Sequence, residues 1–132
     1  LAAEMGMAER CHFCGYIADK KRLGDVYRLA DVFVSASEIE TQGLVFYEAV
    51  ACALPLVAVR DTCIAEIVHD EVNGFLAEPG DVAGLAARLV RILHSADGGR
   101  RLGLAGVELA QACSLERTLD LHEAVYAGVS GK

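Results

Sequence analysis

Two carboxylates, Glu40 and Glu48, flank a short stretch whose residue types suit the binding of an anion. Gly43 lets the backbone approach a ligand closely, because it carries no side chain. The amides of Gly43, Leu44 and Val45 would be the first-turn donors of a helix, and the helix dipole would add to their attraction for a phosphate. The two carboxylates could accept hydrogen bonds from sugar hydroxyls on either side of these amides.

Glu48 is surrounded by apolar neighbours in the sequence, and a carboxylate in such a helix needs partners because removing its charge from water is costly. Two interpretations are open. In the first, Glu48 and Glu40 hold the hydroxyls of a ligand. In the second, Glu48 pairs with a cation such as Arg60, and Glu40 is a solvated loop residue. Residue chemistry alone favours neither.

Short apolar runs alternate with helical patterns along the chain, and the runs have the length of strands. We predict strands at residues 11–15, 31–35, 56–59 and 74–77. We predict helices at residues 19–29, 44–53, 63–68, 81–94, 97–112 and 114–127. Asp81 and Ser114 are expected to cap two of these helices. The alternation indicates an α/β fold with a doubly wound, Rossmann-like parallel sheet, followed by a helical C-terminal part.

Two of the predicted elements have apolar residues on all sides. Residues 32–34 of the predicted strand at 31–35, and residues 56–59, are continuously apolar, which is typical of strands covered on both faces. The helix at 44–53 is apolar almost all round and is expected to be buried. The residues around Glu40 follow the strand at 31–35, and ligands bind at this edge of open α/β sheets.

The composition excludes several classes of protein. A length of 132 residues suits one domain. The formal net charge of −7, from 12 basic and 19 acidic side chains, argues against a nucleic-acid partner and gives no electrostatic reason for binding an anionic membrane. No apolar run approaches the roughly 20 residues of a membrane span. The first residues resemble neither a signal peptide nor a natural start, so we expect a fragment of a longer protein.

Five cysteines are present, which is an odd number, and a chain of this length does not need a disulfide framework. Reduced thiols in a cytoplasmic protein are the simplest interpretation. Cys11 and Cys14 have the spacing of half a zinc site, but no second cysteine pair or spaced histidine pair completes four ligands. We therefore expect no metal site.

An ordered series of short tracts resembles the retaining GT-B glycosyltransferases of the group 1, or family 4, type with the Glu-x7-Glu signature. The signature would be formed by Glu40 and Glu48. The other matching tracts are Gly15-Tyr16-Ile17, residues 29–34, Gly43-Leu44-Val45, Glu66-Ile67-Val68, Asn73-Gly74-Phe75-Leu76 and Pro79-Gly80-Asp81. The resemblance covers nearly the whole chain and implies that residues 1–132 form a partial C-terminal nucleotide-sugar-binding domain.

The resemblance also implies roles for individual residues. The catalytic residues would be Glu40, beside the donor sugar, and Glu48, on the ribose hydroxyls of the nucleotide. The remaining donor-binding residues would be Gly15, Tyr16 and Ile17 near the base and Gln42, Gly43, Leu44 and Val45 near the sugar and diphosphate. The donor would be a nucleotide-diphosphate sugar, with no metal and no further cofactor. The reaction would be transfer of a hexosyl group with attack on the face that the diphosphate leaves, helped by placed charges and dipoles.

The resemblance further implies an acceptor-binding N-terminal domain outside this chain. Peripheral association with the inner face of the membrane through that domain is a further expectation, in an otherwise cytoplasmic protein. The family's pyrophosphate-binding Arg and Lys would precede Leu1, whereas Lys20, Lys21 and Arg22 are expected to lie on a solvated helix face. The chain departs from the family pattern at Ala53, where glycine is usual, and at 62–65, where a Gly-Gly-Ile-Pro-like loop is usual.

Two other classes of protein compete with the transferase interpretation. A non-catalytic Rossmann-like module that binds a nucleotide or a partner would use the same site. A receiver domain would need an acidic cluster at the end of its first strand and a downstream lysine, and neither is evident.

Overall fold

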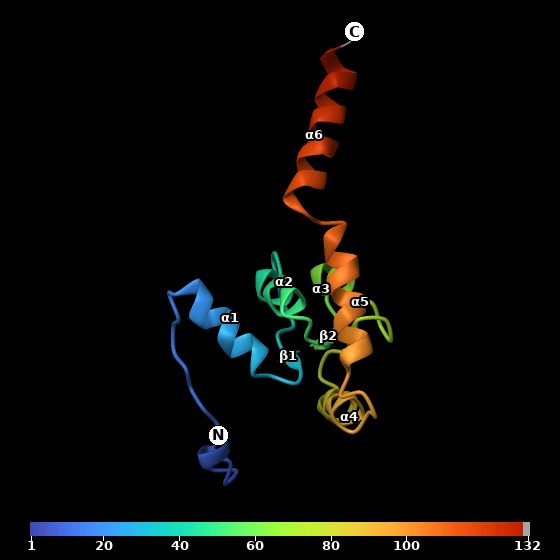
Figure 1. Ribbon diagram of the computed structural model, residues 1–132. Coiled ribbons are helices and arrows are strands. Elements are labelled where there is room, and N and C mark those ends of the chain that lie inside the picture. The colour runs from blue at the N-terminus through green and yellow to red at the C-terminus, as the bar shows by residue number, and fades with distance from the viewer. Residues whose placement is uncertain (131–132) are drawn as a thin grey trace.

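Helices and strands alternate through the first part of the chain, and helices alone follow (Figure 1). This computed structural model describes residues 1–130. The strands are β1 (Phe33–Ser35), β2 (Leu56–Val59) and β3 (Gly74–Ala77). The helices are the 3-10 turn η1 (Ala8–Arg10), α1 (Lys20–Arg28), α2 (Leu44–Ala51), α3 (Thr62–Ile67), α4 (Val82–Leu93), α5 (Arg100–Gln111) and α6 (Leu115–Ser130).

The three strands form a parallel sheet in the order β1-β2-β3, which confirms the predicted α/β fold. Phe33 is paired with Leu56, and Leu56 is paired in turn with Gly74. A side chain at Gly74 would collide with the carbonyl oxygen of Leu56, so the close approach of β3 to β2 requires glycine here.

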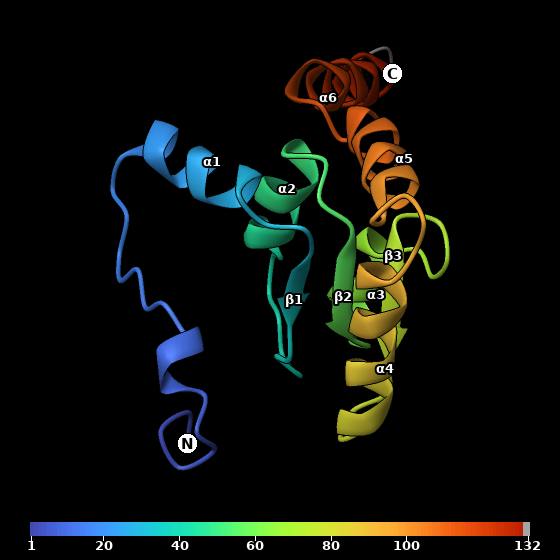
Figure 2. The ribbon, with the colours of Figure 1, turned by 60° about the horizontal axis from the view of Figure 1, so that its bottom comes forward.

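Helices cover both faces of the sheet, as a doubly wound fold requires (Figure 2). Side chains that alternate along a strand point to opposite faces. Leu56 and Ala58 contribute to a buried cluster with residues of α2 and α3. Val57, between them, packs instead with Ile92 of α4 and Leu102 of α5. The two clusters make up the core, and the first of them anchors α2 on one face of the sheet.

The predicted strand at residues 11–15 is wrong. These residues form no ladder, and they lie in an exposed connection that runs from η1 to α1 on the outside of the molecule (Figure 1). Cys11 has the extended backbone that its sequence favours, with φ −107° and ψ 122°. An extended segment becomes a strand only when a neighbouring strand accepts and donates its backbone hydrogen bonds, and none of the described strands does so.

Two predictions of burial are only partly correct. β2 is buried along its whole length as expected, but β1 is an edge strand and the side chain of Val34 is exposed. Helix α2 buries Phe46, Ala49 and Val50, whereas its opposite face is open to solvent. The helix lies against the sheet with one face, so its apolar sequence does not make it an internal helix.

Local sequence signals set several helix ends. The carboxylate of Asp19 accepts hydrogen bonds from the amides of Lys21 and Arg22 at 2.8 and 3.2 Å, which caps α1. Asp81 caps α4 through the amide of Gly84 at 2.8 Å, and the Ser114 hydroxyl accepts from an amide in the first turn of α6, as predicted for both. Among residues 1–130, no helix is both long and apolar enough to cross a membrane.

Candidate functional site

Glu48, the second residue of the predicted signature, lies on the solvent side of α2 and faces α1. Its Oε2 atom accepts a hydrogen bond of 2.9 Å from the hydroxyl of Tyr27. Burial of the phenol raises the pKa of Tyr27 to about 12, and the hydrogen bond to Glu48 and its charge act in the same direction. Tyr27 therefore stays protonated and remains a donor at neutral pH.

Arg60, the cation considered as an alternative partner of Glu48, lies elsewhere. Its Nε atom donates to Oε1 of Glu78 at 2.8 Å in an exposed ion pair. The pairing of Glu48 with Arg60 is therefore wrong. The same alternative described Glu40 as a solvated loop residue. This is only partly correct, because Glu40 is half-buried.

A cavity of about 480 Å³ lies between α1, α2 and the segment before α1. Its wall includes Tyr16, Ile17, Lys20, Leu23, Tyr27 and Glu48. Tyr16 is 94% exposed, so its ring is available to a flat ligand. The cavity thus combines an aromatic face, an apolar floor and a carboxylate. Lys20, expected on a solvated helix face, contributes a positive charge to this wall.

The N-terminus of α2 presents the amide donors that the sequence predicted. Gly43 precedes the helix with φ 61°, in the left-handed region that favours glycine. A Cβ atom there would lie 2.5 Å from Cδ1 of Ile67, so the end of that side chain would have to move, and the backbone angle is the stronger reason for glycine. The first amide bonded back to the Gly43 carbonyl is that of Phe46, at 2.9 Å. No described acceptor pairs with the amides of Gly43, Leu44 or Val45.

Glu40 lies in the loop between β1 and α2, and an acidic residue from the loop after β2 holds its backbone. Its amide donates to Oδ2 of Asp61 at 3.1 Å, and its own Oε1 atom accepts from the amide of Thr41 at 3.1 Å. Cys63 lies close by. Desolvation raises the pKa of the Cys63 thiol, and the charges of Glu66, Asp61 and Glu40 raise it further. Glu40 thus stands in an acidic environment at the carboxyl edge of the sheet.

The structure groups the predicted residues in two places that α2 connects. Tyr16, Ile17 and Glu48 line the cavity. Glu40, Gln42, Gly43, Leu44 and Val45 lie at the beginning of α2 or in the loop before it. Leu44 and Glu48 are four residues apart and share one face of the helix, about 6 Å apart along its axis. Gly15 adjoins the cavity segment, with φ 62°.

Tyr27 and Asp61 were missed as members of the site. Tyr27 matches the apolar pattern of its helix, and it is 21 residues from Glu48 in sequence, so nothing local indicates the contact. Asp61 follows β2 in the sequence and resembles an ordinary loop or capping residue. A signal for either would have required knowing which helices and loops become neighbours in the fold.

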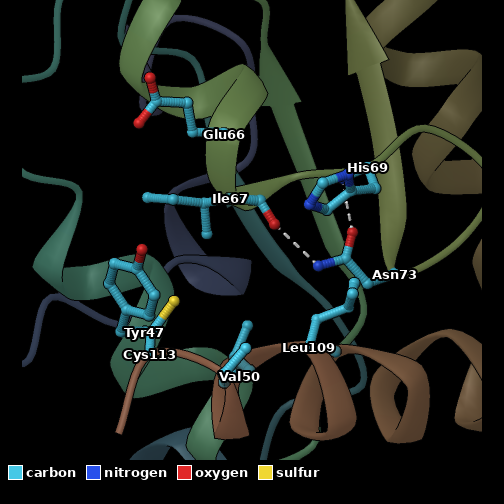
Figure 3. A pocket seen from close by; sticks show the side chains of 11 residues that line it. Tyr47, Val50, Glu66, Ile67, His69, Asn73, Leu109 and Cys113 are labelled. Atoms are coloured by element: carbon cyan, nitrogen blue, oxygen red, sulfur yellow. Dashed lines mark hydrogen bonds between the residues drawn. The ribbon is translucent and has the colours of Figure 1, made fainter. Parts of the chain in front are cut away.

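A second cavity, of about 220 Å³, lies on the other side of α2 (Figure 3). Tyr47, adjacent to Glu48 in sequence, points into it towards Cys113, and Glu66 lies on its far wall. The buried side chain of Asn73 closes it by donating to the Ile67 carbonyl at 2.9 Å and accepting from the His69 amide at 2.7 Å. All buried polar side-chain atoms among the described residues are hydrogen-bonded. We interpret this cavity as a packing feature, because none of the predicted site residues lines it.

A parallel sheet covered by helices on both faces, with the Glu40 loop at the carboxyl ends of its strands, places the chain among the doubly wound α/β domains. A family model described as "Glycosyl transferases group 1" matches residues 1–95. The chain belongs to this family of glycosyltransferases. It is 32% identical over 127 residues to the putative glycosyltransferase EpsD of Bacillus subtilis (strain 168), covering 96% of this chain and 32% of that protein.

Solved structures show the same fold. Sucrose-phosphate synthase of Thermosynechococcus elongatus superimposes with a TM-score of 0.86 at 32% identity, over 99% of this chain and 33% of that one. The Anabaena protein Alr3699/HepE, solved in complex with UDP and glucose, matches with a TM-score of 0.82 at 24% identity, over 96% of this chain and 34% of that one. The fold is therefore that of a GT-B C-terminal domain. The chain spans about a third of the length of these relatives.

Proposed function

We propose that residues 1–132 are the donor-binding part of a retaining glycosyltransferase that transfers a hexosyl group from a nucleotide-diphosphate sugar. In this proposal Tyr16 and Ile17, with the Gly15 turn, contact the base, and Glu48 holds the ribose hydroxyls. The α2 amides and Gln42 contact the diphosphate and sugar, and Glu40 contacts the sugar hydroxyls. A preceding domain supplies the acceptor site and the cations for the diphosphate.

One observation carries this proposal. The exposed ring of Tyr16, the carboxylate of Glu48 and the unpaired amides at the start of α2 follow one another along the cavity and the helix. A nucleoside diphosphate has its base, ribose and phosphates in the same order. Aromatic rings suit bases, carboxylates suit vicinal hydroxyls, and helix N-termini suit phosphates. The family membership supports the same assignment, since its members are glycosyltransferases.

The chemistry that follows needs no covalent role for the protein. The bond between the anomeric carbon and the diphosphate oxygen breaks, a bond to the oxygen of an acceptor hydroxyl forms on the same face, and the proton of that hydroxyl passes to the departing diphosphate. Negative charge develops on the departing diphosphate, where the amides of Gly43, Leu44 and Val45 would stabilise it. Positive charge develops at the anomeric centre, close to the acidic surroundings of Glu40 and Asp61. We propose that this reaction proceeds without a metal or another cofactor.

The location is part of the proposal. The five cysteines are free thiols, which supports a reducing, cytoplasmic environment. Contact with the inner face of the membrane would be made by the acceptor domain. Fractionation of cells, with and without that domain, measures this directly, and a protein found only outside the cytoplasm would contradict it.

The test is calorimetric titration of UDP, GDP and ADP, and of their sugars, into the complete natural protein that carries this chain. Glu48→Ala is expected to weaken binding of the preferred diphosphate about 10- to 100-fold, because hydrogen bonds to a charged group contribute about 1.5–3 kcal/mol. Glu40→Ala is expected to leave diphosphate binding nearly unchanged and to lower the rate of sugar transfer by roughly 100-fold. Glu48 is exposed and Glu40 is only half-buried, so neither change should unfold the protein.

Glu108→Ala is the matched control, because Glu108 is an exposed glutamate on a helix far from the cavity in the sequence and outside its wall. Wild-type binding by both Glu40→Ala and Glu48→Ala would contradict the site assignment. Binding without transfer to any acceptor would instead favour a non-catalytic nucleotide-binding module. The anomeric configuration of the first product, read by NMR, tests retention, and an inverted product would refute it. Undiminished turnover in excess chelator tests metal independence.

A further inference from the structure

Tyr27 contacts both the hydrophobic core and the carboxylate of Glu48. It lies on the inner face of α1, and its ring packs beside Phe33, with ring centroids 6.2 Å apart. Phe33 in turn packs edge-on against Phe46 of α2, at 5.1 Å. The ring thus packs against the hydrophobic cluster, while the hydroxyl reaches the cavity that Glu48 lines. The packing of the Tyr27 ring against the core therefore fixes the position of its hydroxyl.

The hydrogen bond uses only part of the carboxylate. Glu48 has two oxygens that can each accept more than one hydrogen bond. Tyr27 donates to Oε2 at 2.9 Å, and no described group donates to Oε1. The carboxylate is therefore held by one oxygen and is open to a ligand at the other.

We propose that Tyr27 is a positioning residue, whose hydroxyl holds the Glu48 carboxylate in the orientation that receives the ribose hydroxyls of the donor. This inference rests on the proposed function. A glutamate on an exposed helix face would otherwise sample several rotamers, and fixing it before binding reduces the entropy lost when the ligand arrives. The role differs from that of a packing residue, because it depends on the hydroxyl and not on the ring.

Tyr27→Phe removes the hydroxyl and keeps the ring, so it separates the two roles. We measure binding of UDP, GDP and ADP to the complete protein, and then of the 2′-deoxy analogue of whichever diphosphate binds most tightly. Tyr27→Phe is expected to weaken binding of that diphosphate roughly tenfold, the effect of one charge-assisted hydrogen bond. The preference for the ribose form over the 2′-deoxy form should shrink by a similar factor. A packing role would leave that preference unchanged.

A double-mutant cycle supplies the second readout. In a Glu48→Ala background, Tyr27→Phe should change affinity by less than about twofold, because there is no carboxylate left to orient. Tyr126→Phe is the control, since Tyr126 is an exposed tyrosine on α6 and lies outside the cavity wall. Thermal unfolding of each variant checks that the fold is intact.

The outcomes separate this inference from the proposed function. If Glu48→Ala loses binding while Tyr27→Phe keeps wild-type affinity and ribose preference, the positioning role is refuted and the donor site stands. Equal tenfold losses on removing the hydroxyl with and without Glu48 would also refute it, because the hydroxyl would then act on its own. If the wild-type protein binds none of the three diphosphates, the proposed function fails and the inference fails with it.

Discussion

Gly43 is the residue at which backbone angle, packing and candidate chemistry meet. Its φ of 61° is costly for other residues, and a Cβ would lie 2.5 Å from Ile67 Cδ1. Gly43→Ala should therefore destabilise the fold by roughly 1–3 kcal/mol, from the left-handed angle together with the displacement of the end of the Ile67 side chain. It should also weaken diphosphate binding, because the strained left-handed angle favours a shift of the first turn of α2. Urea denaturation and calorimetry measure the two effects.

Gly80→Ala is the control for this prediction. Gly80 also has a positive φ, of 78°, but no atom lies within 4 Å of the place its Cβ would take. Gly80→Ala should lower the free energy of unfolding by only about 1 kcal/mol, from the backbone angle alone. If the two variants lose the same stability and Gly43→Ala still binds the diphosphate normally, the close contact with Ile67 would not constrain the start of α2.

At the scale of single residues, the sequence identifies one partner of each hydrogen bond in the site but not the other. Glu40, Gly43 and Glu48 could be predicted because the acids and the glycine are close together in the chain and their spacing is informative. Their partners Tyr27 and Asp61 could not be predicted, because each hydrogen bond joins residues 21 positions apart. Such contacts depend on which elements become neighbours, and that is decided by the packing of the whole sheet.

At the scale of elements, α5 approaches the end of α2 through two glycines. Gly103 lies so close to the Ala53 backbone that a Cβ would overlap the Ala53 carbonyl oxygen and lie 2.7 Å from its carbon. Gly103→Ala should destabilise the fold by about 3 kcal/mol, because backbone cannot move aside as a side chain can. Chemical denaturation measures the loss.

Gly106→Ala is the matched control, one helical turn further along α5. Its Cβ would meet Asn73 and Val50 at 3.5–3.6 Å, which is ordinary contact. The added methyl group should be neutral or stabilise the protein by up to about 1 kcal/mol, since alanine is the better helix former. A comparable loss in both variants would mean that α5 does not sit against the α2 end as described.

The elements themselves were largely predictable, and the exceptions share one physical reason. β2, β3 and the capped helix α4 have local patterns that match their final environments. The segment at residues 11–15 has a strand-like sequence but no described partner, and α2 has an apolar sequence but only one covered face. Ala53, at a position where the family usually has glycine, adopts φ 57° in the left-handed region. Alanine therefore strains the backbone locally here. A sequence pattern indicates which secondary structures a segment can adopt, and the packing of neighbouring elements determines which one it adopts.

At the scale of the whole molecule, the sheet with its covering helices and α6 are distinct parts. Helix α6 extends away from the sheet and the other helices in Figure 1, and all its described side chains are exposed. Its apolar side chains include Leu119, which is 51% exposed, and Tyr126, which is 71% exposed. The core clusters contain no residue of α6. The stability of the sheet layer should therefore not depend on this helix.

Removal of residues 115–132 tests that independence. We expect the free energy of unfolding of the remaining chain to change by less than about 0.5 kcal/mol, because no described side chain of this segment belongs to the core. Urea denaturation followed through the methyl NMR signals of Val57 and Ile92 reports on the core itself. Ile92→Ala is the contrasting variant. The side chain of Ile92 is buried between the sheet and the helices, and truncating it should lower the free energy of unfolding by about 2–5 kcal/mol. A loss above 1 kcal/mol on truncation would mean that α6 packs onto the sheet layer in solution, and the separation of the two parts would then be wrong.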